Sequence, residues 1–255
     1  MARANNIFNF KGKLGELSFY QHKDYGKIVR RKGGPSAEQI AEAQQFVEVR
    51  ANNSEFAYCS QLSGNIRKAF HEICHSSGDS SLHGRLCGQL KLALKADTDS
   101  APGQRQLTTG ALVKQLTNFP MRKGNGFTNE LIIDISRDTE ALHIHWRVDP
   151  AYLYNMALLK ADRLVLQSYV ACFNLADNAT TYQLSEPNIA HFSLDAFKET
   201  SGNFTHAFEP YRYSLVLAAM QVSCELETNQ RWYPMQAKNT KKSGFVYVNL
   251  VDQEF

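Results

Sequence analysis

The chain of 255 residues contains no run of the roughly eighteen apolar residues that a membrane-spanning helix needs. Its first residues also lack an apolar segment long enough for a secretory signal peptide. The five cysteines are odd in number and show no framework spacing, which favours free thiols in a reducing compartment over a disulfide scaffold. The sequence therefore predicts a cytoplasmic protein without a membrane span. Leaderless export or release within a particle is the alternative.

Several motifs of common enzymes are missing as well. The glycine-rich stretches lack the spacing of a phosphate-binding loop, and no pair of carboxylates suggests acid–base catalysis. A hydrophobic fraction of 43% and a charged fraction of 21% are ordinary for a globular protein. These features favour a non-enzymatic protein with no cofactor.

The N-terminal part has a clear local pattern. Residues 12–35 read GKLGELSFYQHKDYGKIVRRKGGP, in which the β-prone stretches Leu14–Tyr20 and Lys27–Lys32 flank a Lys-Asp-Tyr-Gly turn. Ser36 follows as a helix N-cap, and Gln39 completes a capping box. The pattern predicts a β-hairpin that leads into a helix.

The same residues carry a resemblance. The start Met-Ala-Arg, the motifs GxLGxxSFY and VRxKGG, NNSEF at 52–56, IRxAF at 66–70 and DSxLxxRL at 79–86 are similar to an uncharacterised family seen in Bacteroidota. The resemblance is firm over the first 95 residues and looser from Ala96 onward. The family has no established function, so the resemblance implies no activity.

The rest of the chain suggests an α+β fold. Residues 1–35 form a basic arm and hairpin, 36–95 a helical region that breaks near Asn52, 96–128 a connector, and 129–255 an antiparallel β-sandwich, Ig-like or jelly-roll-like, without intervening helices. In the sandwich, residues 142–148 alternate in period two, which places Trp146 and His145 on opposite faces of a strand.

One motif points to zinc chemistry. His71, Glu72, Ile73, Cys74 and His75 match HExxH, in which a helix places two histidines on zinc and the glutamate activates a bound water. His83 is the candidate third ligand, although it follows two residues later than the metzincin pattern requires. A zinc metallopeptidase with Glu72 as the catalytic residue is therefore the first alternative function. Two exposed histidines near a helix end are the simpler interpretation.

Charge is concentrated at the start of the chain. Residues 1–35 contain eight Lys or Arg and two Asp or Glu, a net charge of +6, against +3 for the whole chain. The residues of this basic arm that we expect to contact a subunit or an anionic partner are Lys11, Lys13, Lys23, Lys27, Arg30, Arg31 and Lys32. They could dock on the acidic body of another copy, bind nucleic acid, or simply keep a hairpin edge soluble.

Strong folding signals with little catalytic chemistry suggest a structural protein. The leading prediction is a homo-oligomeric scaffold subunit of a filament, tube, shell or phage-like particle. A nucleic-acid-binding protein that uses the basic arm is the second alternative.

Overall fold

The computed structural model describes residues 2–3, 11–31, 33–124, 126–127, 131–138, 140–158, 160–194, 200–207, 214–235 and 241–250. These residues form helices and antiparallel sheets, which confirms the predicted α+β class. They belong to two compact units, Met1–Arg50 and Ala51–Phe255. The predicted boundaries at residues 35, 95 and 128 stay predictions.

The first unit contains the predicted hairpin as part of a larger sheet. Its strands, in the order β1-β4-β3-β2, are β1 (Ala2–Arg3), β2 (Gly12–Leu14), β3 (Leu17–His22) and β4 (Gly26–Arg31). The stretch predicted as one strand from Leu14 to Tyr20 is divided by a tight turn at Gly15, whose φ of 57° is easily adopted only without a side chain. The Lys-Asp-Tyr-Gly turn lies between β3 and β4 as predicted.

Helices follow the sheet. Ser36 caps α1 (Ala37–Glu42), and the capping box with Gln39 is present as predicted. A short 3-10 helix, η1 (Gln44–Phe46), precedes the long helix α2 (Val47–Ala69). The predicted break near Asn52 is wrong, because α2 runs through this residue without interruption. The apolar stripe of α2 packs in the core on the helical side of the sheet, and this packing outweighs the low helix propensity of asparagine.

The second unit is built on a large antiparallel sheet. Among the described residues it has six strands, with β7 and β11 at its centre. The strands are β7 (Arg163–Phe173), β8 (Tyr182–Leu184), β9 (Asn188–Ser193), β11 (Leu215–Thr228), β12 (Arg231–Pro234) and β13 (Lys241–Leu250). Both central strands are buried over most of their length, which indicates that both faces of the sheet are covered.

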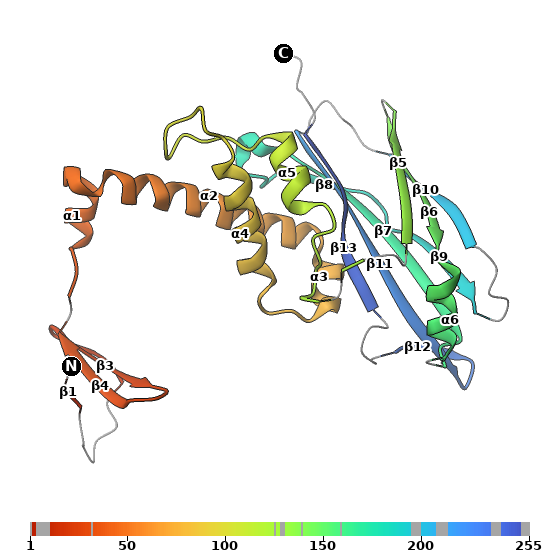
Figure 1. The fold of residues 1–255 in the computed structure, drawn as a ribbon, viewed down its shortest axis with the longest axis horizontal. Helices are drawn as coiled ribbons and strands as arrows, with labels where there is room; N and C mark the ends of the chain where they lie inside the picture. The colour runs from red at the N-terminus through yellow and green to blue at the C-terminus, as the bar shows by residue number, and fades with distance from the viewer. Residues whose placement is uncertain are drawn as a thin grey trace. The chain divides into compact units, whose positions relative to one another are not determined.

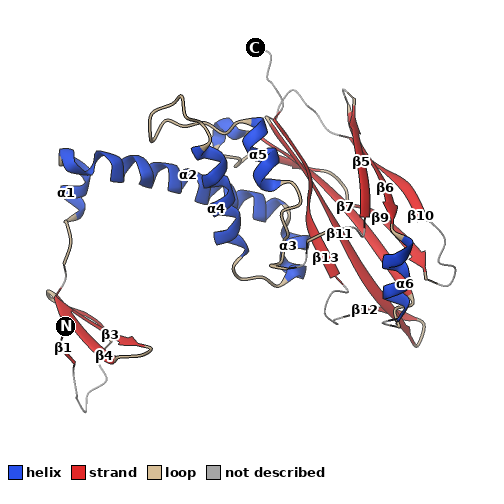
Figure 2. Ribbon diagram, viewed as in Figure 1, coloured by secondary structure: helices blue, strands red, loops and turns tan. Residues whose placement is uncertain are grey.

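Helices cover one face of this sheet and a smaller sheet covers the other (Figure 1). The helices are α2, α3 (His71–Ser77), α4 (Leu82–Lys95) and α5 (Thr109–Leu116). The smaller sheet, in the order β10-β6-β5, consists of β5 (Leu131–Arg137), β6 (Ala141–Val148) and β10 (Thr200–Ala207). Figure 2 shows the same succession of helical layer, large sheet and small sheet.

Each interface has its own hydrophobic core. On the helical side, Leu62 and Leu90 pack with Phe173 and Phe245, and all four side chains are fully buried or nearly so. On the other side, residues of β6 and β10 such as Ile144 and Phe204 pack against alternate residues of β7 and β11. Two antiparallel sheets therefore pack face to face, while the Ig-like or jelly-roll-like form of a sandwich stays a prediction.

Three features of the second unit differ from the sequence-based expectation. Helix α5 lies within the segment predicted to be a connector, and helix α6 (Pro150–Leu158) interrupts the strands that were expected without helices. Asp149 starts α6 by accepting a hydrogen bond from the Ala151 amide at 2.7 Å. Strands β9, β10 and β12 lie in stretches where no strand was expected from the sequence.

Within the described ranges, none of the helices combines the length and the apolar composition that crossing a bilayer requires.

Candidate functional site

The HExxH motif forms a short helix of its own. Phe70 separates α3 from α2, and Phe70 and Ile73 are buried in the core on the helical side of the sheet. His71 and His75 are exposed on α3, with ring centroids 5.5 Å apart and planes inclined by 13°. The structure thus brings the two predicted zinc ligands together, one helical turn apart.

Glu72 contacts the sheet. The buried Tyr169 of β7 donates a hydrogen bond to Glu72 Oε2 at 3.3 Å. Burial, together with the negative charge of Glu72, raises the pKa of Tyr169 to about 12. The residue predicted to be catalytic in the zinc-peptidase interpretation, Glu72, thus also accepts a hydrogen bond from a core tyrosine.

His83 lies elsewhere. Its ring contacts the hydroxyl groups of Ser60 and Ser63 on α2, at 3.3 and 3.1 Å. No group of three or more His, Cys, Asp or Glu side chains arranged for a metal ion occurs in the described part of the chain. The structure thus places His83 against α2, while the zinc-peptidase interpretation with His71, His75 and His83 stays a prediction.

The basic arm lies on the sheet of the first unit. The exposed cations of its described residues are Lys11, Lys13, Lys23, Arg30 and Arg31. Lys27 is half-buried, and Lys32 lies outside the described residues. Because directly paired residues of neighbouring strands point to the same face, the register divides the arm into two faces.

One face, here called the Leu14 face, consists of Leu14, Leu17, Phe19, Val29 and Arg31. Leu14 and Leu17 are directly paired, and their side chains are 70% and 41% exposed. Arg31, opposite Leu17, forms an exposed ion pair with Glu16 at 2.6 Å. This face combines exposed leucines with a cation at its border.

The opposite face, here called the Arg30 face, contains Lys13, Ser18, Tyr20 and Arg30. Lys13, Ser18 and Arg30 are in register across β2, β3 and β4. The Arg30 guanidinium lies 5.6 Å from the centroid of the Tyr20 ring, within the range of a cation–π contact. The sequence shows the charges, but only the register shows which cations lie beside an aromatic ring.

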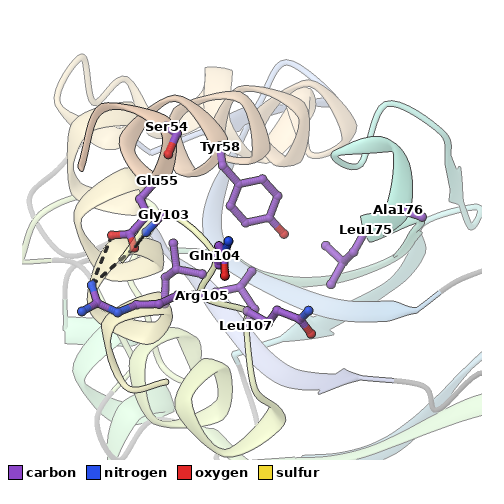
Figure 3. A pocket seen from close by; sticks show the side chains of 11 residues that line it. Ser54, Glu55, Tyr58, Gly103, Gln104, Arg105, Leu107, Leu175 and Ala176 are labelled. Atoms are coloured by element: carbon purple, nitrogen blue, oxygen red, sulfur yellow. Dashed lines mark hydrogen bonds and ion pairs between the residues drawn. The ribbon is translucent and has the colours of Figure 1, made fainter. Parts of the chain in front are cut away.

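A cavity of about 540 Å³ opens in the second unit between α2, the loop before α5 and the turn after β7 (Figure 3). Its lining includes the side chains of Tyr58, Gln104, Leu107 and Leu175. Tyr58 points from α2 into the cavity, and burial raises its pKa. The lining is mixed polar and aliphatic and also includes the ion pair of Glu55 with Arg105.

Hydrogen bonds hold the rim of this cavity. The buried Glu55 accepts the Gly103 amide at 2.8 Å and contacts Arg105 through both oxygens at 3.3 Å. Gly103 has a φ of 90°, and a Cβ there would lie 3.1 Å from Ala51. Fifty residues separate Glu55 from Arg105, so no local motif in the sequence could have revealed this cluster.

Comparison with known proteins gives little guidance. No protein-family model and no curated protein matches the chain. The chain is similar to β-glucosidase 3B from Thermotoga neapolitana in complex with glucose, at 11% identity and a TM-score of 0.23, over 49% of this chain and 17% of that one. The complex of β-glucosidase 3B with glycerol matches at 10% identity and a TM-score of 0.23, over 64% of this chain and 20% of that one. The match thus spans a fifth or less of the glucosidase. The resemblance to the family from Bacteroidota stays a prediction.

Proposed function

We propose that the chain is a non-enzymatic structural subunit that associates with further copies of itself through the Leu14 face. The observation that carries the proposal is the exposure of the paired residues Leu14 and Leu17 on a sheet in a unit of its own. A sheet normally buries its apolar face against another layer. In the described residues of the first unit, Ile28 is the one buried apolar side chain, and it belongs to the opposite face.

Charge favours a second copy as the partner. Residues 1–35 carry a net charge of +6, and the remainder of the chain carries −3. Complementary potentials of this kind steer association and discourage pairing between two basic arms. An arm that docks on the body of the next copy is a head-to-tail contact, which produces a ring, or a filament if it does not close. The assembly that we propose is a filament, tube, shell or phage-like particle in the cytoplasm.

The test is the native mass of the untagged chain, measured by light scattering on a sizing column over a wide range of concentration. We expect a mass well above the 28.8 kDa of one chain for the natural sequence. The double variant Leu14→Ser/Leu17→Ser is expected to remain a single chain, because it removes the exposed apolar pair.

Ile132→Ser is the matched control, since Ile132 is 50% exposed on β5, outside the basic arm. This variant is expected to assemble like the natural chain. A natural chain of 28.8 kDa at every concentration would contradict self-association. If Ile132→Ser lost assembly and Leu14→Ser/Leu17→Ser did not, the copies would associate through β5 and not through the Leu14 face, which would contradict the proposal.

A further inference from the structure

The Arg30 face offers a row of phosphate-binding groups. Lys13, Ser18 and Arg30 are in register on neighbouring strands, so the row spans roughly 10 Å at the usual strand spacing. Lys13 and Arg30 are exposed, and Ser18 lies between them. Guanidinium, ammonium and hydroxyl groups are the side-chain groups that most often contact phosphate oxygens in nucleic-acid complexes.

Aromatic rings lie beside this row. Tyr20 is two residues after Ser18 on the same face of β3, with its ring 5.6 Å from the Arg30 guanidinium. His22 follows on the same face, and its ring lies 4.8 Å from that of Tyr25, which is 58% exposed in the turn. A line of cations next to a line of rings is the arrangement with which sheets hold single strands, since phosphates contact the cations while bases stack on the rings.

No carboxylate interrupts the row. The two acids of residues 11–31 are Glu16, paired with Arg31 of the Leu14 face, and Asp24 in the turn. The exposed leucines lie on the Leu14 face, and Ile28, which pairs with Tyr20 on the Arg30 face, is buried. Among the described residues the Arg30 face therefore presents no exposed aliphatic side chain that a membrane surface would engage. The charge and the rings together favour a polyanion with accessible bases.

We propose that the Arg30 face binds single-stranded nucleic acid, with Lys13, Ser18 and Arg30 on the phosphates and Tyr20 as a stacking platform. This inference does not rest on self-association, because it uses the opposite face of the sheet. A duplex presents phosphates but no free base faces, so the proposal requires that an unpaired strand binds more tightly than a duplex.

The test uses the full chain and a fluorescein-labelled oligothymidylate of twenty nucleotides, followed by fluorescence anisotropy at several salt concentrations. Measurements in the Leu14→Ser/Leu17→Ser background remove any contribution from multivalent assembly. The variant Lys13→Ala/Arg30→Ala is expected to lose at least roughly tenfold in affinity, and the slope of log K against log salt should flatten by about 1.4 for two lost phosphate contacts.

Arg31→Ala is the matched control, because it removes one guanidinium from the Leu14 face. Its effect should be smaller than that of Arg30→Ala. Tyr20→Leu should weaken binding roughly 5- to 100-fold without changing the salt slope, as stacking contributes little to counterion release. Circular dichroism of each variant checks that the protein remains folded.

Three results would overturn the proposal. They are the absence of binding by the natural sequence at low salt, equal losses for Arg30→Ala and Arg31→Ala, and equal affinity for the strand and for a duplex of the same length. The last two would indicate a diffuse electrostatic attraction that any polyanion satisfies.

Discussion

His206 shows how much a single residue contributes between the two packed sheets. The side chain is 1% exposed, and its ring nitrogens lie 2.7 Å from the hydroxyl oxygens of Ser168 and Ser185. Ser185 already donates to the Val170 carbonyl, so its oxygen accepts from His206 Nδ1, and Ser168 donates to Nε2. Ser168 is fully buried, which keeps this serine–histidine pair from any substrate and makes it a structural link between β7 and β10.

This link predicts a pH dependence of stability. Burial lowers the pKa of His206 from 6.5 to about 4. Between these two pH values the unfolded chain therefore binds a proton at His206 that the folded chain does not bind. The contribution of neutral His206 to the free energy of unfolding is complete above pH 6.5. It is lost as the pH falls towards 4, by up to about 3 kcal/mol. Urea denaturation between pH 7.5 and 4.5 should show a steeper loss for the natural chain than for His206→Gln, and equal slopes would contradict the assignment.

Glu55 is a second buried polar residue with a testable role. Glu55→Gln removes the charge opposite Arg105 but keeps the size of the side chain, so we expect the free energy of unfolding to fall by about 1–3 kcal/mol. Chemical denaturation measures this. Glu140→Gln, at an exposed position, should change stability by less than about 0.5 kcal/mol. A similar small effect for Glu55→Gln would show that the ion pair contributes little to the rim of the cavity.

At the scale of elements, residues 118–121 cover the outer edge of β13. The Asn118 amide donates to the Phe245 carbonyl at 2.8 Å, the Phe245 amide to the Phe119 carbonyl at 3.1 Å, and the Met121 amide to the Ser243 carbonyl at 2.9 Å. Gly244 permits this approach, because a Cβ there would lie 2.7 Å from the Phe119 carbonyl oxygen. An edge that would otherwise be open to other strands is thereby paired.

Two glycine substitutions should therefore have opposite effects. Gly244→Ala is expected to lower the free energy of unfolding by about 1–3 kcal/mol, because the added methyl group pushes residues 118–121 from the edge. In α4, a Cβ at Gly88 would meet no atom within 4 Å, so Gly88→Ala should stabilise by up to about 1 kcal/mol. Thermal unfolding of both variants measures the difference, and equal shifts would contradict this account of the edge.

The elements that the sequence predicts are those with their own periodicity. Strand β6 alternates clearly, and the capping box of α1 is a local signal, so both were found. Strand β10 was missed because its sequence, with Gly202, resembles a turn; the glycine is needed because the Trp146 ring covers it. The Arg30 face was predictable from the sequence only as a set of charges. The pairing of Lys13 with Ser18 and Arg30 depends on strand register and not on composition.

At the scale of the whole molecule, the two units differ in how much they bury. The described part of the first unit has Ile28 as its buried apolar side chain, whereas the second unit has two extensive cores. Hydrophobic burial sets most of the free energy of folding, so the small sheet should open far more often than the large one.

Hydrogen exchange of the intact protein tests this difference. Amides of β3 and β4 should be protected at least roughly 100-fold less than those of β7 and β11, because local opening of a small unit needs less free energy than global unfolding. Strand β6 serves as a reference within the second unit. Equal protection in β4 and β11 would show that assembly, or another contact, stabilises the arm.

The central strands also affect how the chain folds during its synthesis. Both faces of β7 and β11 are apolar, and β7 leaves the ribosome well before its partner, since Phe173 pairs with Leu215. At 5–20 residues per second, β7 waits on the order of 2–8 s for β11 to be synthesised. During that interval the edge of β7 that pairs with β11 has no partner strand, although β8 and β9 can already pair with the other edge. Yield during expression should thus depend on temperature and on chaperones that hold nascent chains, more than the stability of the finished protein would suggest.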